Sequence, residues 1–337
     1  MTLPITSVVP APDEVARIVR AAGEHLARRL APLAAAADAG ALGEEDYPAV
    51  AAAIDESLGA LRTTNLWGPA NRLPSSALWS LVGPLLERSL LISRARHKPR
   101  GYAGDYEMLA WIHEQRRGDD PLGQLLDRYF QEQAAPVAVR NRMAMMAGWI
   151  REAALAAAGP LKIAMVGSAF GWEIKDALAS LAESVRERIT VTLLDLDPAA
   201  LEFARRELAP LLPAERLLTA AENLFRLPDR PRAAARLDGI DWLFCPGLFD
   251  YLDDEQASAM LGLFWRGLAP RGRLCVFQFA PQNPTRASME WLGNWYLLYR
   301  TAADLGQLAA TAGIPQSAIA TGAEPLGVDL YLTAGRD

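Results

Sequence analysis

Hydrophobic residues recur at helical spacing through the first half of the chain. A helix is predicted to begin at Pro12 and to bury Val15, Ile18, Val19 and Leu26 on one face. The same spacing predicts further helices over about 46–62, 75–96, 106–115, 121–133 and 136–158. The pattern therefore indicates an all-α domain over residues 1–158 that buries its apolar face as a helix bundle.

Short apolar runs alternate with helical patterns after the break at Gly159-Pro160, which we take as the domain boundary. Strands are predicted over 161–166, 189–194, 217–220, 240–245 and 273–279, and helices over 172–185, 198–209 and 253–268. Alternating strands and helices predict an α/β domain over 159–337 with a parallel sheet and right-handed crossovers. The tail differs: a helix over 302–313 precedes strand-like runs over 317–321 and 328–333, which predict an antiparallel pair at the sheet edge.

The first of these strands leads into the most informative motif of the chain. The apolar run from Ile163 ends in a small-residue turn, from Gly167 to Gly171, and a helix opens near Glu173. The second strand ends in Asp195. A strand–turn–helix followed by a strand that ends in a carboxylate is typical of nucleoside binding, because the turn presents backbone N–H groups and the carboxylate accepts the ribose hydroxyls.

The composition of the turn indicates which nucleoside is bound. Ala169 stands where a dinucleotide fingerprint needs its middle glycine, and bulky Phe170 lies beside it. The chain contains no Gly-Lys-Ser/Thr sequence, which excludes a P-loop. S-adenosylmethionine (SAM) fits this turn, because it carries a ribose and an amino acid but no phosphate.

Charge and composition narrow the class of protein. The net charge of −6 gives no electrostatic footprint for nucleic acid or an anionic membrane, and no apolar run is long enough for a membrane span or a secretory signal. Cys245 and Cys275 lie in apolar runs, as buried thiols of a reducing compartment do, so we expect a cytoplasmic protein. The three histidines and two cysteines have no metal-ligand spacing, so no metal is expected.

The order of these parts resembles the class I SAM-dependent methyltransferases over about residues 160–337. The resemblance implies a Rossmann-like sheet with antiparallel C-terminal edge strands. It also implies that Glu222 or Asn223, after the third strand, meets the adenine amino group and that the loop from Gly247 to Leu252 faces the reacting methyl. The cofactor-binding residues that it implies in this domain are Gly167, Ser168, Ala169, Gly171, Glu173, Asp195, Leu196, Glu222, Asn223 and Gly247.

Segments of the first half and the tail resemble a bacterial subfamily of these enzymes with an N-terminal helical lid. The segments are Arg100–Glu107, Arg140–Arg142, Asn283–Arg286 and Tyr299–Thr301. Members of that subfamily are assigned to making a 3-hydroxy fatty acid methyl ester. The chain is also similar to azetidine-2-carboxylate synthases, which cyclise SAM itself and release methylthioadenosine. The motifs leave both activities open.

The resemblance and the chemistry of a sulfonium together suggest the catalytic residues. Aromatic faces stabilise a soft cation, and polar groups orient the nucleophile. The expected catalytic residues are Tyr102, Asn141, Phe249 and Tyr251, with Arg100 and Tyr106 as further cofactor-binding residues. Asp105 has a plain structural alternative, since it is a natural N-cap for the helix that follows.

Three functions fit these sequence features. The SAM domain contains no histidine, which favours a carboxylate or amine acceptor that needs no strong base, or attack by the amino group of SAM itself. A protein that binds SAM without turning it over is the third. We expect a small-molecule partner, which could be SAM itself. The Ala- and Leu-rich N-terminal helices could pair two copies in a homodimer.

Overall fold

The contacts of the chain divide it into two units, which the computed structural model describes over residues 9–337. The first unit contains the chain up to Val137 together with Pro284–Tyr296. The second contains Ala138–Asn283 and Leu297–Asp337. We call them the helical unit and the sheet unit, and describe each by itself. No helix within residues 9–337 combines the length and apolarity needed to cross a bilayer.

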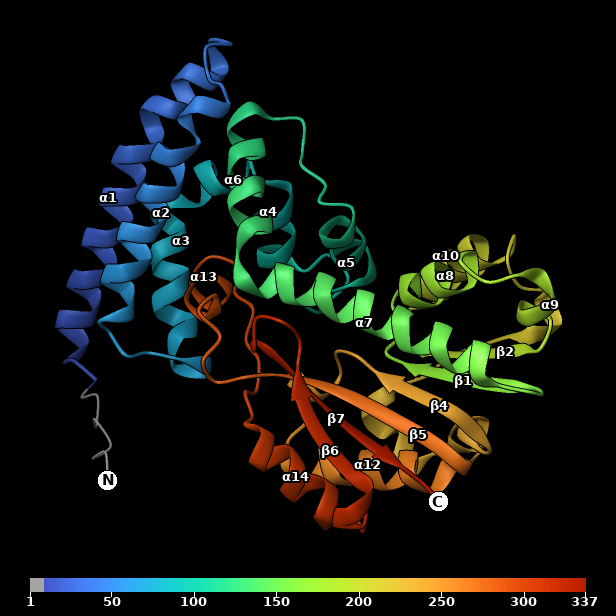
Figure 1. The fold of residues 1–337 in the computed structure, drawn as a ribbon. Coiled ribbons are helices and arrows are strands. Elements are labelled where there is room, and N and C mark those ends of the chain that lie inside the picture. Colours follow the sequence, from blue (N-terminus) through green and yellow to red (C-terminus); the bar gives the residue numbers. More distant parts are fainter. Residues whose placement is uncertain (1–8) are drawn as a thin grey trace. The chain divides into compact units, whose positions relative to one another are not determined.

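The helical unit is built on a bundle in which α1 packs against α2 and α3 (Figure 1). Its helices are α1 (Pro12–Asp38), α2 (Tyr47–Arg62), α3 (Arg72–Leu86), α4 (Leu90–His97), α5 (Tyr106–His113), α6 (Pro121–Glu132) and α13 (Arg286–Trp291). Leu26, Leu30, Ile54 and Leu78 are fully buried in its core, and Trp291 from the far end of the chain joins them. The predicted all-α organisation of this region is therefore observed.

One predicted helix of this unit is two helices. The pattern over 75–96 suggested a single helix, but α3 ends at Leu86 and α4 begins at Leu90. Ser89 is the N-cap of α4, and its hydroxyl accepts the Ile92 N–H at 2.9 Å. The same hydroxyl donates to the fully buried carboxylate of Asp127 at 2.5 Å, which also accepts the Leu91 N–H. These caps satisfy the first amides of a new helix, and apolar periodicity does not reveal them.

The sheet unit has the predicted Rossmann-like α/β fold with antiparallel strands at its C-terminal edge. Its seven strands lie in the order β3-β2-β1-β4-β5-β7-β6; β1 to β5 are parallel, and β7 is antiparallel to both of its neighbours. The strands are β1 (Leu161–Val166), β2 (Ile189–Asp195), β3 (Leu217–Ala221), β4 (Ile240–Cys245), β5 (Leu268–Phe279), β6 (Ile319–Ala323) and β7 (Asp329–Gly335). The carboxyl ends of β1, β2 and β4 therefore lie side by side, and ligands of such sheets bind at that edge.

Helices cover both faces of the sheet. They are α7 (Ala134–Ala156), α8 (Trp172–Ala179), α9 (Glu183–Arg186), α10 (Pro198–Leu208), α11 (Pro231–Ala234), α12 (Asp254–Gly267) and α14 (Ala302–Thr311). Alternate residues of β1 point to opposite faces: Ile163 and Met165 pack with α7, α8 and α10, while Ala164 and Val166 pack in the core that includes α12 and α14 (Figure 1). Both faces are apolar, which is why the central strands read as continuous hydrophobic runs.

Two boundaries in this unit differ from the sequence-based prediction. The helix predicted over 172–185 is interrupted at residues 180–182 and forms α8 and α9. Strand β5 begins at Leu268, whereas the sequence predicts that this strand begins at residue 273. The register of β5 against β4 shifts between Ile240 and Trp242, and Arg271 takes a φ of +64° in this irregular stretch. A bulge of this kind interrupts regular pairing without ending the strand.

The division between the units also falls elsewhere than the predicted boundary at residue 158. From Ala138 onward, α7 belongs with the sheet unit. Met146 and Ile150 are fully buried against the sheet, and Arg142 donates to Asp329 of β7 at 2.7 Å. The break at Gly159-Pro160 ends a helix, but the packing of that helix places it with the strands that follow.

Candidate functional site

The turn between β1 and α8 carries three residues with positive φ. Gly167 has φ +70°, Ala169 +45° and Gly171 +67°. Glycine takes this region readily, whereas alanine is strained there. The Ala169 N–H donates to Oδ2 of Asp195 at 2.8 Å, and this bond holds the strained residue in place. Local backbone strain of this kind concentrates at functional sites.

The amides of this turn are used by the protein itself. The N–H groups of Gly167 and Ser168 both donate to the carbonyl of Leu194, at 2.8 and 3.2 Å, and the Gly171 N–H donates to the carbonyl of Ser168 at 3.0 Å. With the Ala169 amide on Asp195, four backbone donors of the turn are committed. A phosphate-binding turn must leave such donors for its ligand, so this geometry excludes a pyrophosphate cradle here.

Asp195 lies at the carboxyl end of β2, as predicted. Oδ1 accepts the Asp197 N–H at 2.9 Å and Oδ2 accepts the Ala169 N–H, so each oxygen keeps a lone pair for a further donor. Burial raises the pKa of Asp195 to about 6, although the hydrogen bonds from the two backbone amides act to lower it. The neighbouring Leu196 is 46% exposed, which leaves an apolar surface beside the carboxylate.

Ser168 and Glu173 place two buried polar side chains around the same turn. The Ser168 hydroxyl is buried and finds no hydrogen-bond partner within residues 9–337. Glu173, in the first turn of α8, is 5% exposed, and burial raises the pKa of its carboxyl to about 7. Buried polar groups usually have partners, so both side chains are candidates for ligand contact.

The end of β3 distinguishes between the two residues considered for the adenine. The Glu222 side chain forms ion pairs with Arg230 at 3.3 Å and Arg236 at 3.5 Å, and its N–H donates to the Asp195 carbonyl. Asn223 is exposed. Asn223 is therefore the better candidate to read the adenine edge.

Buried side chains fix the loop after β4. Oδ1 of Asp250 accepts the Gln278 side-chain N–H at 2.7 Å and the Phe279 N–H at 2.8 Å, and the Arg300 guanidinium donates to the carbonyls of Phe249 and Leu252. Burial, with the nearby Asp329 carboxyl, raises the pKa of Asp250 well above its usual range. These hydrogen bonds hold residues 249–252, which follow Gly247 in the loop, in one position.

The two aromatic residues predicted in this loop differ in burial. Phe249 is fully buried and packs against Phe264 with ring centroids 6.4 Å apart. A side chain without exposed surface contacts no ligand in this conformation, so Phe249 has a packing role here. Tyr251 is half-buried, and its catalytic role stays a prediction.

Sequence reasoning missed two buried carboxylates near the same edge, Glu324 and Asp329, whereas it predicted the neighbouring Asn141 as a catalytic residue, and that role stays a prediction. Asn141 donates to Glu324 at 2.7 Å, and Arg142 donates to Asp329 at 2.7 Å. Both carboxylates are buried at the turn into β7. Their only sequence signal was acidic residues next to an apolar strand, which normally indicates a solvent-exposed turn.

The segment 97–107 belongs to the helical unit and has its own contacts there. Nη2 of Arg100 donates to the Tyr106 hydroxyl at 2.9 Å, with the guanidinium 4.4 Å from the centre of that ring. Asp105 is the predicted N-cap: its carboxylate accepts the Met108 N–H at 3.0 Å. The roles predicted for Arg100, Tyr102 and Tyr106 in ligand binding stay predictions.

We expect Asp105→Ala to destabilise the helical unit by about 3 kcal/mol or more, because it removes an N-cap and one partner of a buried ion pair. Asp105 is 2% exposed and accepts the Arg94 Nε–H at 2.9 Å. Chemical denaturation measures the effect, with the exposed Asp119→Ala as control. Equal stabilities of the two variants would contradict this structural role.

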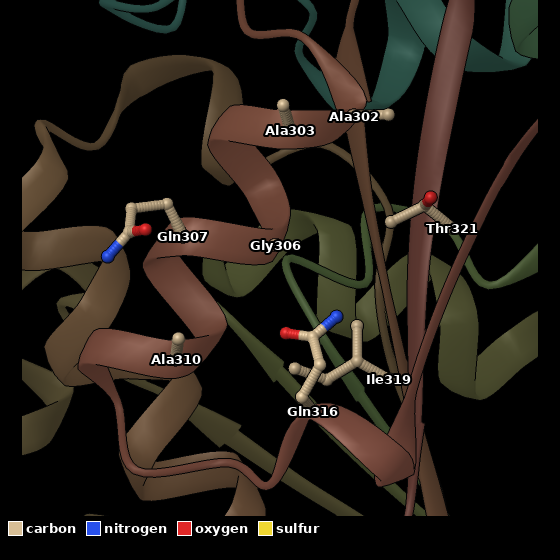
Figure 2. A pocket seen from close by; sticks show the side chains of 8 residues that line it. All are labelled: Ala302, Ala303, Gly306, Gln307, Ala310, Gln316, Ile319 and Thr321. Carbon is tan, nitrogen blue, oxygen red and sulfur yellow. The ribbon is translucent and has the colours of Figure 1, made fainter.

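A separate cavity of about 300 Å³ lies between α14 and β6 (Figure 2). Its lining residues are Ala302, Ala303, Gly306, Gln307, Ala310, Gln316, Ile319 and Thr321. None of these side chains ionises, so the cavity offers no group for acid–base or charge-based chemistry. Within residues 9–337, no cluster of His, Cys, Asp and Glu could hold a metal ion either. The candidate site is the carboxyl edge of β1, β2 and β4, where Asp195 accepts the Ala169 N–H of the turn after β1.

Comparisons with known proteins bear on the fold. No protein-family model and no curated protein matches the chain. Its structure is similar to that of a possible exported protein from Bordetella parapertussis, with a TM-score of 0.56, 17% identity, and coverage of 97% of this chain and 99% of that one. It is also similar to the CurJ carbon methyltransferase, with a TM-score of 0.50, 14% identity, and coverage of 96% and 92%. At such low identity these likenesses show a shared fold.

Proposed function

We propose that the sheet unit binds SAM at the carboxyl edge of β1, β2 and β4, and that the protein transfers the SAM methyl group to a small molecule. One observation carries this proposal: Asp195 lies buried at the carboxyl end of β2, and its carboxylate and the Leu194 carbonyl accept the N–H groups of Gly167, Ser168 and Ala169 in the adjacent turn. The site therefore suits a nucleoside without phosphates. SAM is such a nucleoside, and its sulfonium makes it a group donor.

The charges around the turn support a cationic ligand. Asp195 and Glu173 are both buried carboxyls whose pKa burial raises, to about 6 and about 7. A ligand that brings positive charge stabilises their ionised forms. SAM brings a sulfonium and an ammonium, whereas a dinucleotide brings two negative phosphates.

The adenine is assigned to the surface next to Asp195. Leu196 offers an exposed apolar side chain, and Asn223 offers an amide that can both donate and accept. Leu224 is buried, and its side chain lies 3.8 Å from where a Cβ on Gly167 would be. These residues supply one apolar face and one polar edge, as a purine requires.

A carboxylate or an amine is the proposed methyl acceptor. All three histidines, His25, His97 and His113, precede the sheet unit in the sequence, so no imidazole of that unit can act as general base. A carboxylate or neutral amine attacks a methyl sulfonium without one, given orientation and a dry site. The same reasoning applies to the alternative function, in which the neutral amino group of SAM attacks its own γ-carbon, the Cγ–S bond breaks, and methylthioadenosine leaves as azetidine-2-carboxylate forms.

Incubation of the purified protein with SAM alone, followed by mass spectrometry, tests these functions. Our account predicts tight binding without methylthioadenosine, and S-adenosylhomocysteine only after carboxylates or amines are added. Methylthioadenosine with a matching amino-acid product would establish cyclisation instead. Binding without turnover across the acceptor panel would favour a SAM-binding protein. Failure to bind SAM would overturn the proposal.

A further inference from the structure

A buried arginine of the sheet unit has part of its hydrogen-bonding capacity unused. Arg142 on α7 is 4% exposed, and its Nη1 donates to Oδ2 of Asp329 at 2.7 Å. Its Nε is shielded from water and donates to no atom within residues 9–337. Nη2 likewise forms no hydrogen bond to that part of the chain. Buried donors rarely remain unmatched, because each costs free energy without its partner.

The unmatched donors lie on one edge of the guanidinium. Nε–H and one Nη2–H point in parallel, and this side-on edge matches the two oxygens of a carboxylate. The Asp329 contact uses Nη1 and therefore leaves that edge unoccupied. A bidentate carboxylate is the ligand that would satisfy both donors at once.

The position of Arg142 joins it to the candidate site. Its Nη2 lies 4.0 Å from where a Cβ on Gly247 would be, so it sits beside the loop after β4. It also interacts electrostatically with Glu173, in the first turn of α8, and with Asp250. Arg142 thus lies near both the end of the Gly167–Gly171 turn and the loop that follows β4.

Two carboxylates of the sheet unit near Arg142 accept hydrogen bonds from other groups, whereas Oδ1 of Asp329 is buried and accepts none within residues 9–337. Oδ1 of Asp250 accepts from Gln278 and from the Phe279 amide. Glu324 accepts the Asn141 side chain at 2.7 Å and the Val328 N–H at 2.8 Å. Glu173 forms no hydrogen bond to another side chain of the described chain, so it too is available to a ligand. A guanidinium edge and a buried carboxylate are therefore both left for an incoming molecule.

We propose that Arg142 and Glu173 bind the α-amino acid end of SAM, with its carboxylate on the side-on edge of Arg142 and its ammonium on Glu173. The inference rests on the proposed function, since it presumes that SAM is the ligand. The pair offers one positive and one negative group, which is what a zwitterion requires. Glu173 lies two residues after Gly171, the last residue of the turn, so the cofactor fits this pair better than an acceptor does.

Calorimetric binding of SAM and of decarboxylated SAM tests the assignment of the carboxylate. The unmodified protein should prefer SAM by roughly 10- to 100-fold, because the analogue lacks the group that satisfies Arg142. Arg142→Lys should abolish that preference: the lysine retains the charge beside Asp329 but has no bidentate edge. Arg151→Lys, on an exposed position of the same helix, should leave the preference intact.

The outcomes separate this inference from the proposed function. If SAM and its decarboxylated analogue bind the unmodified protein equally well, the inference fails while SAM binding stands. If Arg142→Lys folds and keeps the full preference, the inference fails as well. If the unmodified protein binds no SAM, the proposed function falls and the inference falls with it. The comparison of the two ligands on the unmodified protein requires no variant, so a misfolded variant leaves a decisive test in place.

Discussion

Replacement of Asp195 by alanine is expected to weaken SAM binding by about 100-fold or more, because two hydrogen bonds from the ribose to a charged group are lost. Two effects act together. The carboxylate is the proposed ribose acceptor, and its Oδ2 also holds the strained Ala169 amide. Calorimetry of SAM binding measures the loss. Asp238→Ala, an exposed position of the same unit, should bind as the unmodified protein does.

A ligand cycle isolates the ribose contact from the effect on the turn. The unmodified protein should bind S-adenosylhomocysteine more tightly than its 2′-deoxy analogue, and Asp195→Ala should bind the two with nearly equal affinity. The coupling energy between the side chain and the hydroxyl then reports their direct interaction. If Asp195→Ala still discriminates as strongly as the unmodified protein, the ribose assignment is wrong.

Glu173→Gln is expected to stabilise the free protein while it weakens SAM binding. Burial raises the pKa of Glu173 to about 7 from the ordinary 4.5, so the folded state binds the proton more tightly than the unfolded state. Ionisation therefore costs the folded state up to about 3 kcal/mol, a penalty that is absent below pH 4.5, grows as pH rises and is complete above pH 7. Glutamine removes this penalty, so the gain in unfolding free energy should appear at pH 8 and vanish near pH 4.

SAM binding should respond in the opposite direction. The proposed ammonium contact needs an ionised carboxylate, so Glu173→Gln should lower the affinity by roughly 10-fold or more at pH 8. Denaturation and calorimetry at several pH values measure the two effects, with the exposed Glu187→Gln as control. A purely structural Glu173 would change stability and leave affinity unchanged, and that result would remove it from the site.

The fold could be predicted from sequence because its signals are local. The central strands read as continuous apolar runs that end at glycine, proline or aspartate, and alternation with helices dictates a parallel sheet. The turn after β1 and Asp195 at the end of β2 were recognisable for the same reason. Both occupy fixed places in a strand–turn–helix unit, and the structure joins them by the hydrogen bond from Ala169 to Asp195.

The details that sequence did not predict depend on distant residues. Arg142 and Asp329 are 187 residues apart, so no local pattern indicates that they pair. The division of the helix predicted over 75–96 depends on Asp127, which accepts bonds from the first turn of α4. Phe249 was predicted to face the methyl group, but it is buried and packs against Phe264. Partners of this kind become visible only in three dimensions.

A crystal structure of the protein with S-adenosylhomocysteine would test the central claim most directly. The account predicts that the ribose hydroxyls lie within hydrogen-bond distance of Asp195 and that the adenine lies against Leu196. It also predicts that the amino acid end lies next to the Gly167–Gly171 turn. A complex with the ligand elsewhere, or a nucleotide phosphate bound at that turn, would contradict it.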